Sequence, residues 1–262
     1  MNILETIIAK KKMEVAESKR NKSVSELESA PSFNHETLSF SDYLLREDKT
    51  GIIAEFKRKS PSKGIINDHA TVKEVTTAYA HFGASAISIL TDEEFFGGSL
   101  QDLLEATTND VPLLRKDFII DEYQLLESKA FGAEVILLIA ACLTVDEVAA
   151  FAAFAKNIGL NVLLEIHSEQ ELHHICNDVD VVGVNNRDLK TFATDINCSI
   201  ELSSKIPADK IKISESGIDN IDSIKLLRQH GFKGFLIGEK FMKEKDPAKA
   251  FENFTIELKR YT

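Results

Sequence analysis

The segment at residues 52–64, IIAEFKRKSPSKG, places two charged residues inside an otherwise apolar strand-like run. Successive side chains of a strand alternate between its two faces, so Glu55 and Lys57 point the same way. Opposite charges on one face of a strand that ends inside a protein are costly to desolvate. We therefore expect Glu55 and Lys57 to be paired with each other, to carry out chemistry, or both.

The residues directly after this run suit an anionic ligand. The stretch at 58–64, RKSPSKG, supplies positive charges, hydroxyl groups and a flexible glycine. Charge-assisted hydrogen bonds from such groups commonly hold phosphate or carboxylate. The segment as a whole predicts chemistry on an anionic substrate.

Polar residues of the same kinds recur at the ends of other apolar runs. They are Lys116 in VPLLRKDF, Glu165 in VLLEIH, Asn185, Asn186 and Arg187 in VVGVNNRDL, and Glu215 in IKISESGI. Lysines, carboxylates, an amide and a guanidinium in one place would be equipped for general acid–base catalysis. This chemistry requires a fold that brings the ends of these runs together.

The order of elements along the chain predicts such a fold. Short β-branched runs alternate with longer amphipathic segments. We predict eight strands, at residues 52–56, 86–90, 111–115, 135–139, 162–166, 181–184, 210–214 and 234–237. We predict helices at 71–82, 99–106, 122–130, 145–158, 168–176 and 220–230, with capping residues Thr71, Ser99, Asp121, Thr144, Ser168 and Asn220.

Eight parallel strand–helix units most simply close into a (β/α)8 TIM barrel of the α/β class. An open sheet would leave two edges and would normally carry a glycine-rich dinucleotide turn, and the chain has no G-x-G-x-x-G. No linker-like segment divides the chain, so we expect residues 1–262 to form a single barrel domain. Residues 1–50 are too many for a linker, and we expect them to form extra N-terminal helices packed on the barrel, at its bottom or beside its mouth.

The two loops after the last predicted strands indicate a phosphate site. In TIM barrels, phosphate is commonly bound by backbone N–H groups after the seventh and eighth strands. Ser216 and Gly217 follow the seventh predicted strand, and Gly238 and Glu239 follow the eighth. Glycine lets the backbone approach a ligand closely, and a helix N-terminus adds its dipole.

Composition argues against several classes of partner. The net charge of −11 argues against nucleic acid, because binding to a phosphate backbone needs a broad basic surface. The longest apolar run, at 135–143, is shorter than the roughly 20 residues that span a bilayer, and no apolar signal segment begins the chain. We therefore expect a cytoplasmic protein with no membrane partner.

Cys142, Cys176 and Cys198 lack paired spacing, which indicates reduced thiols rather than disulfides or a zinc site.

Six motifs, each at the end of a predicted strand, occur in a characteristic order. AEFKRKSPSKG, LRKDFI, LLEIH, GVNNRDL, SESGI and FLIGE together resemble the indole-3-glycerol-phosphate synthase family of tryptophan biosynthesis, and the resemblance covers the whole chain. It implies a carboxy-lyase that converts 1-(2-carboxyphenylamino)-1-deoxyribulose 5-phosphate to indole-3-glycerol phosphate, with loss of carbon dioxide and water. It implies no metal and no organic cofactor.

The resemblance also implies roles for individual residues. Lys116 would be the general acid that protonates the developing alkoxide. Lys57 and Glu165 would carry out the dehydration, with Glu55 holding or relaying protons to Lys57, although the division of steps among them stays open. Asn185 would position a hydroxyl group or Glu165. The implied substrate contacts are Ser60 and Arg187 for the carboxylate, Pro61 and Phe118 for the anthranilate ring, and Glu215, Ser216, Gly217, Gly238 and Glu239 in the last two loops.

Structural interpretations compete with these functional ones. Glu55 and Lys57 could form an ion pair that only stabilises the barrel. Lys116 and Asp117 could be a solvated loop pair, and the two asparagines at 185–186 could be turn formers.

Two further groups of polar residues have structural interpretations of their own. The histidines at positions 81, 167, 173 and 174 have no ligand spacing supported by other donors, which favours packing or surface roles over metal binding. The basic run at 10–12, KKK, is typical of a solvated helix face.

Two other functions are considered. Another phosphosugar barrel, such as a phosphoribosylanthranilate isomerase, usually lacks both the trio of Lys57, Lys116 and Glu165 and the long N-terminal extension. If the protein were a non-catalytic barrel that only binds a phosphate ligand, we would expect other residues in place of Lys116 or Glu165, and the chain retains both. The oligomeric state is not readable from the sequence. We take as the working expectation a monomer that binds a small anionic phosphosugar–anthranilate substrate.

Overall fold

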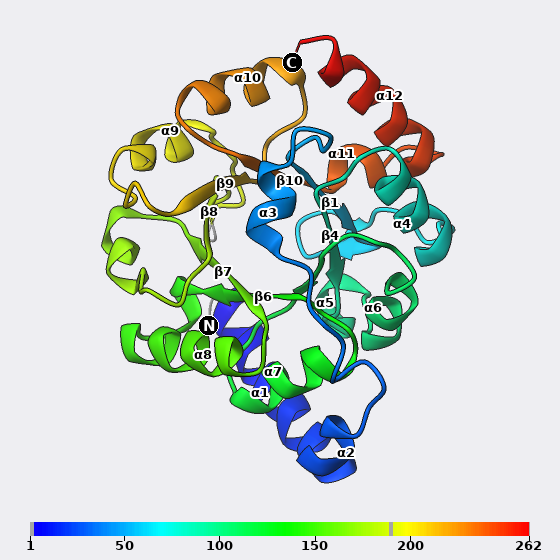
Figure 1. Ribbon diagram of the computed structural model, residues 1–262, viewed down its shortest axis with the longest axis vertical. Helices are drawn as coiled ribbons and strands as arrows, with labels where there is room; N and C mark the ends of the chain where they lie inside the picture. Colours follow the sequence, from blue (N-terminus) through cyan, green and yellow to red (C-terminus); the bar gives the residue numbers. More distant parts are fainter. Residues whose placement is uncertain (1–2, 189–190, 262) are drawn as a thin grey trace.

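The computed structural model of the protein describes residues 3–188 and 191–261. Its centre is a closed barrel of parallel strands in the order β1-β10-β9-β8-β7-β6-β5-β4 (Figure 1). β1 pairs with both β10 and β4, which closes the ring. The (β/α)8 barrel predicted from the sequence is confirmed.

The strands and the elements around them follow the predicted alternation. The barrel strands are β1 (Ile52–Phe56), β4 (Ala86–Leu90), β5 (Leu113–Lys116), β6 (Val135–Ile139), β7 (Asn161–Ile166), β8 (Val181–Asn185), β9 (Ile211–Glu215) and β10 (Gly234–Ile237). The surrounding helices are α4 (Val72–His81), α5 (Glu93–Phe96), α6 (Leu100–Ala106), α7 (Glu122–Ala130), η1 (Ala140–Cys142), α8 (Val145–Asn157), η2 (Glu169–His174), α9 (Asn197–Ser203), α10 (Ile221–Gln229), α11 (Glu239–Met242) and α12 (Pro247–Lys259). A small hairpin, β2 (Lys59–Ser60) with β3 (Gly64–Ile65), follows β1.

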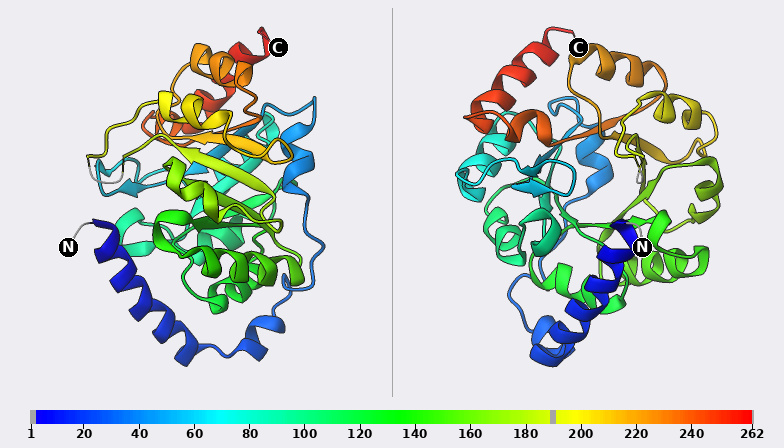
Figure 2. Two further views of the ribbon diagram at one scale, coloured as in Figure 1. Left: turned by 90° about the vertical axis from the view of Figure 1, so that its left-hand side faces the viewer. Right: turned by 180° about the vertical axis from the view of Figure 1, so that it is seen from behind.

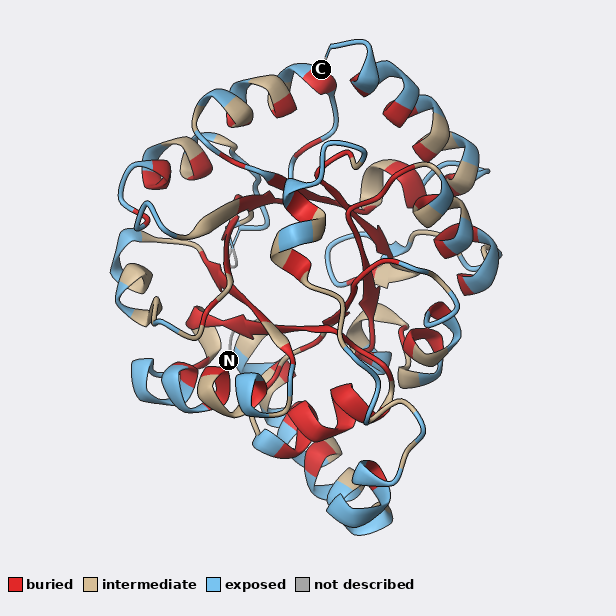
Figure 3. Cartoon of the chain, viewed as in Figure 1, coloured by how far each residue is buried: buried red, intermediate tan, exposed pale blue. Residues whose placement is uncertain are grey.

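The barrel strands are buried on both faces, and they form most of the buried centre in Figure 3. Side chains such as Ile53, Leu114 and Leu163 pack on one another inside the barrel. Their strand neighbours, such as Ile52 and Leu113, pack outward against the helices. This double burial explains why strand sequences such as VILLI in β6 are continuous apolar runs.

The N-terminal part of the chain contributes α1 (Ile3–Asn21), α2 (Val24–Glu28) and α3 (Phe40–Leu45). α1 starts at the mouth and runs along the outside of the barrel towards α2, after which the chain crosses to the opposite end (Figure 2). There α3 closes the bottom, and Phe40 and Leu44 pack against the interior residues of the barrel. The sequence left two locations open for these helices, and the structure uses both.

Lys11 of α1 is buried, so the prediction of a solvated basic run is wrong at this position. Its Nζ lies 2.9 Å from Asp92 Oδ2 and 2.9 Å from Asp117 Oδ1. Asp117 Oδ2 in turn lies 3.0 Å from Arg115 Nη2, so Asp117 is not part of a solvated loop pair either. A buried charge network therefore attaches α1 to the barrel directly beside Lys116.

Two predicted elements differ from the structure. The predicted helix at 168–176 is the short 3-10 helix η2, and within the described chain the side chain of Ser168 makes no capping hydrogen bond. The carboxylate of Glu171 instead accepts a hydrogen bond from the backbone N–H of His167 at 2.5 Å. β5 begins two positions later than predicted because Pro112 has no N–H to donate to the ladder.

Several short elements were not predicted. The β2–β3 hairpin, α5, α9 and α11 are too short to show a hydrophobic period. Among the described helices, none is long and apolar enough to cross a membrane.

Candidate active site

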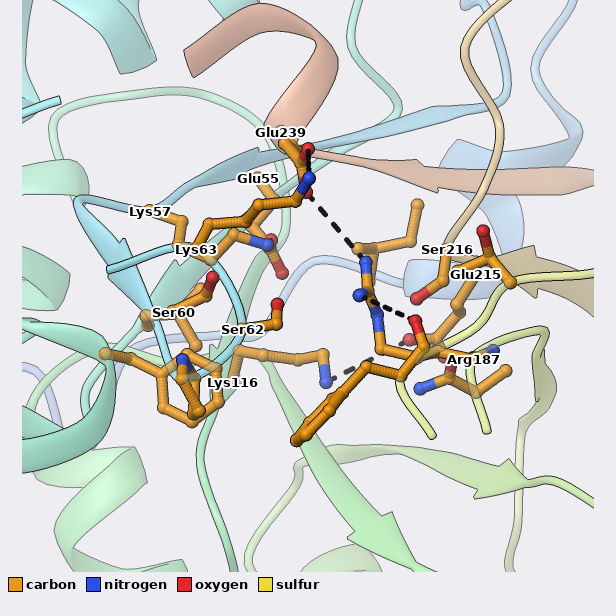
Figure 4. Close-up of a pocket in the computed structure, with 18 of the residues that line it drawn as sticks. Glu55, Lys57, Ser60, Ser62, Lys63, Lys116, Arg187, Glu215, Ser216 and Glu239 are labelled. Carbon is orange, nitrogen blue, oxygen red and sulfur yellow. Dashed lines mark hydrogen bonds and ion pairs between the residues drawn. The ribbon is translucent and has the colours of Figure 1, made fainter. Parts of the chain in front are cut away.

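A cavity of about 430 Å³ opens at the C-terminal ends of the barrel strands. Every catalytic and substrate-binding residue predicted from the sequence lines it: Glu55, Lys57, Ser60, Pro61, Lys116, Phe118, Glu165, Asn185, Arg187, Glu215, Ser216, Gly217, Gly238 and Glu239. Figure 4 shows labelled side chains from several strands and loops converging on one space. Their common location is observed, while the roles assigned to them stay predictions.

Lys116 is the centre of a buried cluster of charge at the bottom of the cavity. Its Nζ lies 3.1 Å from Glu165 Oε2 and 4.0 Å from Glu215 Oε2. The three residues come from β5, β7 and β9, whose C-terminal ends the barrel brings together. Gly183 on the intervening β8 makes room, because a Cβ there would come within 2.3 Å of Glu215 Oε1.

The cluster holds its two carboxyl groups in different protonation states. Burial and the nearby charge of Glu165 raise the pKa of Glu215 to about 8. Burial also disfavours the charged form of Glu165, but Lys116 and His167 beside it hold its pKa well below the usual range. Burial disfavours the ammonium of Lys116, yet the two glutamates raise its pKa above the ordinary value. At neutral pH the site therefore combines an ammonium, a carboxylate and a neutral carboxylic acid.

The pair expected on β1 is present and faces the cavity. Lys57 Nζ lies 2.5 Å from Glu55 Oε1, and the Glu55 side chain is almost fully buried. The loop after β10 passes directly over this carboxylate. A Cβ at Gly238 would come within 2.5 Å of Glu55 Oε1, so this approach requires glycine.

The loop after β9 has an unusual backbone conformation at the cavity wall. Ser216 has a φ of +67° and Gly217 a φ of +72°. In the described chain, Ser216 and Phe192 are the non-glycine residues with positive φ, and both line the cavity. Such strain persists only where the surroundings impose it, and it is concentrated at functional sites.

The amide after β8 that faces the cavity is Asn185, whose Oδ1 accepts a hydrogen bond from the backbone N–H of Arg187 at 3.0 Å. Asn186 is buried and structural, with its Nδ2 donating to Ser214 Oγ at 2.9 Å and to the Ser216 carbonyl at 3.0 Å. The last residue of the GVNNRDL motif lies outside the described residues.

Glu239 has a side-chain position that the sequence did not predict. Its Oε1 lies 3.8 Å from Lys63 Nζ, and its Oε2 lies 3.9 Å from Arg187 Nη2. Lys63 and Arg187 come from two loops, Glu239 is the first residue of α11, and the three meet at the cavity (Figure 4). A carboxylate of the protein thus occupies the space between two cations that face the cavity.

The cations at 58–64 only partly match the predicted anion site. Arg58 Nη1 lies 2.6 Å from Asp102 Oδ2, and Lys59 Nζ donates to the Glu94 carbonyl at 2.7 Å. Among the described residues that line the cavity, Lys63 is the one cation of this stretch. Arg58 follows Lys57 and therefore points to the opposite face.

Other residues of the cavity were missed by sequence reasoning. Ile3, Leu4 and Ile7 of α1 line it, and none of the three was singled out from the sequence as a site residue. Phe96 adds to the apolar wall, with its ring centroid 6.2 Å from that of Phe118. No group of His, Cys, Asp and Glu among residues 3–188 and 191–261 could hold a metal ion.

A (β/α)8 barrel with a lysine–glutamate cluster at the C-terminal ends of its strands is the arrangement of a TIM-barrel enzyme. The family model described as "Indole-3-glycerol phosphate synthase" matches residues 4–254. The chain is 48% identical over 254 residues to the indole-3-glycerol phosphate synthase of Bacteroides thetaiotaomicron, with 97% of each chain covered. It is 44% identical over 262 residues to that of Prochlorococcus marinus, with 96% of this chain and 88% of that one covered.

The chain belongs to the indole-3-glycerol phosphate synthase family, as its motifs predicted. It is a carboxy-lyase of tryptophan biosynthesis that acts on a small phosphorylated substrate. The alternative of another phosphosugar barrel is not favoured.

More distant solved structures share the barrel. A tryptophan synthase complex from Pyrococcus furiosus matches with a TM-score of 0.59 and 15% identity, over 80% of this chain and 97% of that one. The 3-hexulose-6-phosphate synthase from Salmonella typhimurium matches with a TM-score of 0.61 and 12% identity, over 80% and 99%. At these identities the matches show the fold alone.

Proposed function

We propose that Lys116 and Glu165 are the central acid–base pair with which this enzyme converts 1-(2-carboxyphenylamino)-1-deoxyribulose 5-phosphate to indole-3-glycerol phosphate. The observation that carries the proposal is the position of Lys116 Nζ, 3.1 Å from Glu165 and 4.0 Å from Glu215 at the bottom of the cavity. Groups that can give and accept protons thus lie within contact of one another.

Ring closure is assigned to Lys116. The aromatic carbon that bears the carboxylate attacks the ketone, a C–C bond forms, and the carbonyl electron pair moves to oxygen. The developing alkoxide takes a proton from Lys116, whose raised pKa keeps it protonated beforehand. The C–C bond to the carboxylate then breaks, carbon dioxide leaves, and the electrons of that bond restore the aromatic ring. Glu215, whose pKa is raised to about 8, lies 4.0 Å from Lys116 Nζ and is assigned a substrate contact beside it.

Dehydration is assigned to the second lysine and to Glu165. The hydroxyl group formed by ring closure leaves as water after it accepts a proton from Lys57. Glu165 removes the proton from the ring nitrogen, and the electrons of that N–H bond expel the hydroxyl group through the aromatic ring. The neighbouring ring CH2 then loses a proton and the nitrogen regains one, which leaves the indole double bond. Glu55, 2.5 Å from Lys57 Nζ, holds this lysine and relays the next proton to it. Asn185 positions the hydroxyl group or Glu165.

Substrate contacts are assigned to the walls of the cavity. Arg187 and Ser60 bind the substrate carboxylate, and the Ser60 Oγ is buried with no hydrogen-bond partner within the described chain, so a ligand can supply one. Phe118 and Pro61, with Phe96 beside them, contact the anthranilate ring. The backbones at 216–217 and 238–239 bind the phosphate.

The test is turnover in Lys116→Ala, followed by indole fluorescence after substrate is added, with substrate binding measured by calorimetry. Loss of a general acid lowers turnover by about 10² to 10⁴-fold, while binding is expected to persist. Lys225→Ala on the outer helix α10 is the matched control, because its half-exposed side chain pairs with Asp222 there, away from the cavity. Near-normal turnover in Lys116→Ala would remove this lysine from the general-acid role.

We also propose a cytoplasmic monomer in which the barrel and residues 1–50 form one domain. The ion pairs of Lys11 with Asp92 and Asp117 support the single domain. Cys142, Cys176 and Cys198 form no disulfide among themselves in the structure, which fits a reducing compartment. Light scattering coupled to gel filtration measures the mass, and a second unfolding transition for the N-terminal helices would contradict the single domain.

A further inference from the structure

His167 follows Glu165 by two residues and its ring contacts the Glu165 carboxylate. Its side chain is only 12% exposed, and it is not among the described residues that line the cavity. The Nε2 atom lies 3.3 Å from Glu165 Oε1, and the Nδ1 atom lies 3.5 Å from Glu171 Oε2. One imidazole ring thus sits between two carboxylates, one from β7 and one from η2.

This geometry requires a proton on each ring nitrogen. A neutral imidazole has one N–H and one lone pair, and the lone pair would face the oxygens of an ionised carboxylate. Both nitrogens are buried, and in the described structure neither contact reaches hydrogen-bond geometry, so the attraction is that of ion pairs. An imidazolium satisfies both carboxylates, whereas a neutral ring would repel one of them.

We propose that His167 is a positioning residue that is held as an imidazolium by Glu171 and in turn keeps Glu165 ionised and correctly oriented. Glu165 uses its two oxygens differently, with Oε1 towards His167 and Oε2 towards Lys116. The imidazolium therefore determines which oxygen remains directed at Lys116 and the cavity. This inference rests on the proposed role of Glu165 as a base.

Glu171 is well placed to be the anchor of this chain of contacts. Its Oε2 accepts a hydrogen bond from the backbone N–H of His167 at 2.5 Å, so the same carboxylate contacts both the backbone and the ring of one residue. The order Glu171, His167, Glu165 and Lys116 alternates negative and positive charge from the outer helix to the cavity.

The other titratable groups near His167 do not reverse this assignment. They are Lys116 on β5 and Glu215 on β9, Cys142 on η1, His174 on η2, and Cys198 on α9, whose Sγ lies 3.4 Å from the His167 carbonyl. Burial favours the neutral ring, but Glu165 and Glu171 raise the pKa of His167 to about 10. Because this pKa is raised, the stabilisation from the charged ring is complete below about pH 6.5 and is lost as the pH rises through about 10.

The first test is the pH dependence of kcat/KM in His167→Gln. Without the imidazolium the pKa of Glu165 rises, so the acid limb of the profile is expected to move to higher pH by about 1 to 3 units. Activity should recover at higher pH, whereas a purely structural role would lower it equally at every pH. Glu171→Gln should move the limb in the same direction.

The matched control is His173→Asn, an exposed histidine on the same short helix, which should leave the profile unchanged. An acid limb that stays in place in both His167→Gln and Glu171→Gln overturns the proposal.

The second test observes the ring directly by NMR of ¹³C-labelled histidine Cε1 in the full chain, with the resonance assigned by its loss in His167→Gln. The resonance is expected to keep its protonated shift from pH 6 to pH 8. Replacement of Glu165 by glutamine should lower the pKa of the ring, because coupling between two sites is reciprocal. Titration of His167 near its ordinary pKa of about 6.5 overturns the proposal.

The two tests separate this inference from the proposed catalytic roles. If Glu165→Gln keeps near-normal turnover while the His167 ring of the unsubstituted protein stays protonated, the base role of Glu165 fails and the ion-pair chain stands. If Glu165→Gln is inactive and the ring titrates as an ordinary histidine, the positioning role of His167 fails alone.

Discussion

Replacement of Lys11 by methionine is expected to destabilise the protein far more than the same replacement of its neighbour Lys10. The Lys11 side chain is 5% exposed, and its Nζ lies 2.9 Å from both Asp92 and Asp117. The Lys10 side chain is 43% exposed and lies 2.8 Å from Glu94. The two lysines share a helix, a charge and similar contact lengths, but they differ in burial and in the number of carboxylate partners, since Lys11 also lies 2.6 Å from Glu14.

The magnitude follows from what each replacement leaves behind. Removal of one partner from a buried ion pair leaves an uncompensated charge and costs about 3–5 kcal/mol. In Lys11→Met, Asp92 loses its cation, while Asp117 keeps Arg115 at 3.0 Å. An exposed pair such as that of Lys10 contributes about 0–1 kcal/mol. The two variants should therefore differ by at least about 2 kcal/mol, out of a total stability of about 5–15 kcal/mol.

The assay is urea unfolding followed by circular dichroism, since the chain has no tryptophan for fluorescence. A double variant, Lys11→Met with Asp92→Asn, should recover part of the loss. The asparagine removes the uncompensated charge and retains the Oδ1 that accepts a hydrogen bond from the Phe95 N–H at 2.8 Å. Equal midpoints and slopes for Lys10→Met and Lys11→Met would refute the reasoning that burial determines the contribution of these pairs.

Three further outcomes are expected. Gly217→Asp should weaken substrate binding by at least about tenfold relative to the isosteric Gly217→Asn, because the added charge repels the substrate phosphate, and calorimetry measures both. Glu239→Gln should lower KM by up to about fivefold, and more at low salt, because its carboxylate 3.8 Å from Lys63 and 3.9 Å from Arg187 competes with the anionic substrate. Acid should destabilise the protein through Asp117, whose buried cationic partners outweigh burial and lower its pKa to about 2. The resulting stabilisation of about 2 kcal/mol is present above about pH 4 and is lost as the pH falls through about 2. The measurement compares the free energy of unfolding of Asp117→Asn with that of the native chain between pH 2 and 7.

Each of these outcomes has a result that would contradict it. A substrate analogue without phosphate should bind Gly217→Asp and Gly217→Asn equally, and an unequal loss would place the repulsion elsewhere. The exposed Glu244 lies outside the cavity, so Glu244→Gln controls for charge alone, and an equal fall in KM would deny a specific role to Glu239. If Asp117→Asn and the native chain lose stability in parallel down to pH 2, protonation of the Asp117 carboxylate is not the cause of the acid destabilisation.

The fold and the strand-end residues could be predicted because they depend on repeating patterns. Runs such as VILLI at 135–139 are apolar throughout because both faces of a barrel strand are covered. Once the chain has eight such units, the barrel brings Lys116, Glu165 and Glu215 together, because the C-terminal ends of parallel strands share one edge. The location of these residues therefore follows without knowledge of any side-chain conformation.

Side-chain partners within loops and helices could not be predicted, because they depend on how two elements pack. Lys10 and Lys11 are identical in type, and a period of 3.6 shows that they face different directions without showing which one meets the barrel. The sequence analysis favoured a packing or surface role for His167 over metal binding. Its two carboxylate partners become adjacent only through the turn between β7 and η2.

Helix α1 lies at the entrance of the cavity, since Ile3, Leu4 and Ile7 are part of the cavity wall. Any polypeptide joined ahead of Ile3 would therefore emerge beside the entrance, whereas α12 lies on the outer ring of helices (Figure 2). For immobilisation on a support, or for fusion to a second enzyme, attachment after α12 leaves the entrance clear. An affinity tag on the N-terminal side should be cleaved before any kinetic comparison of variants.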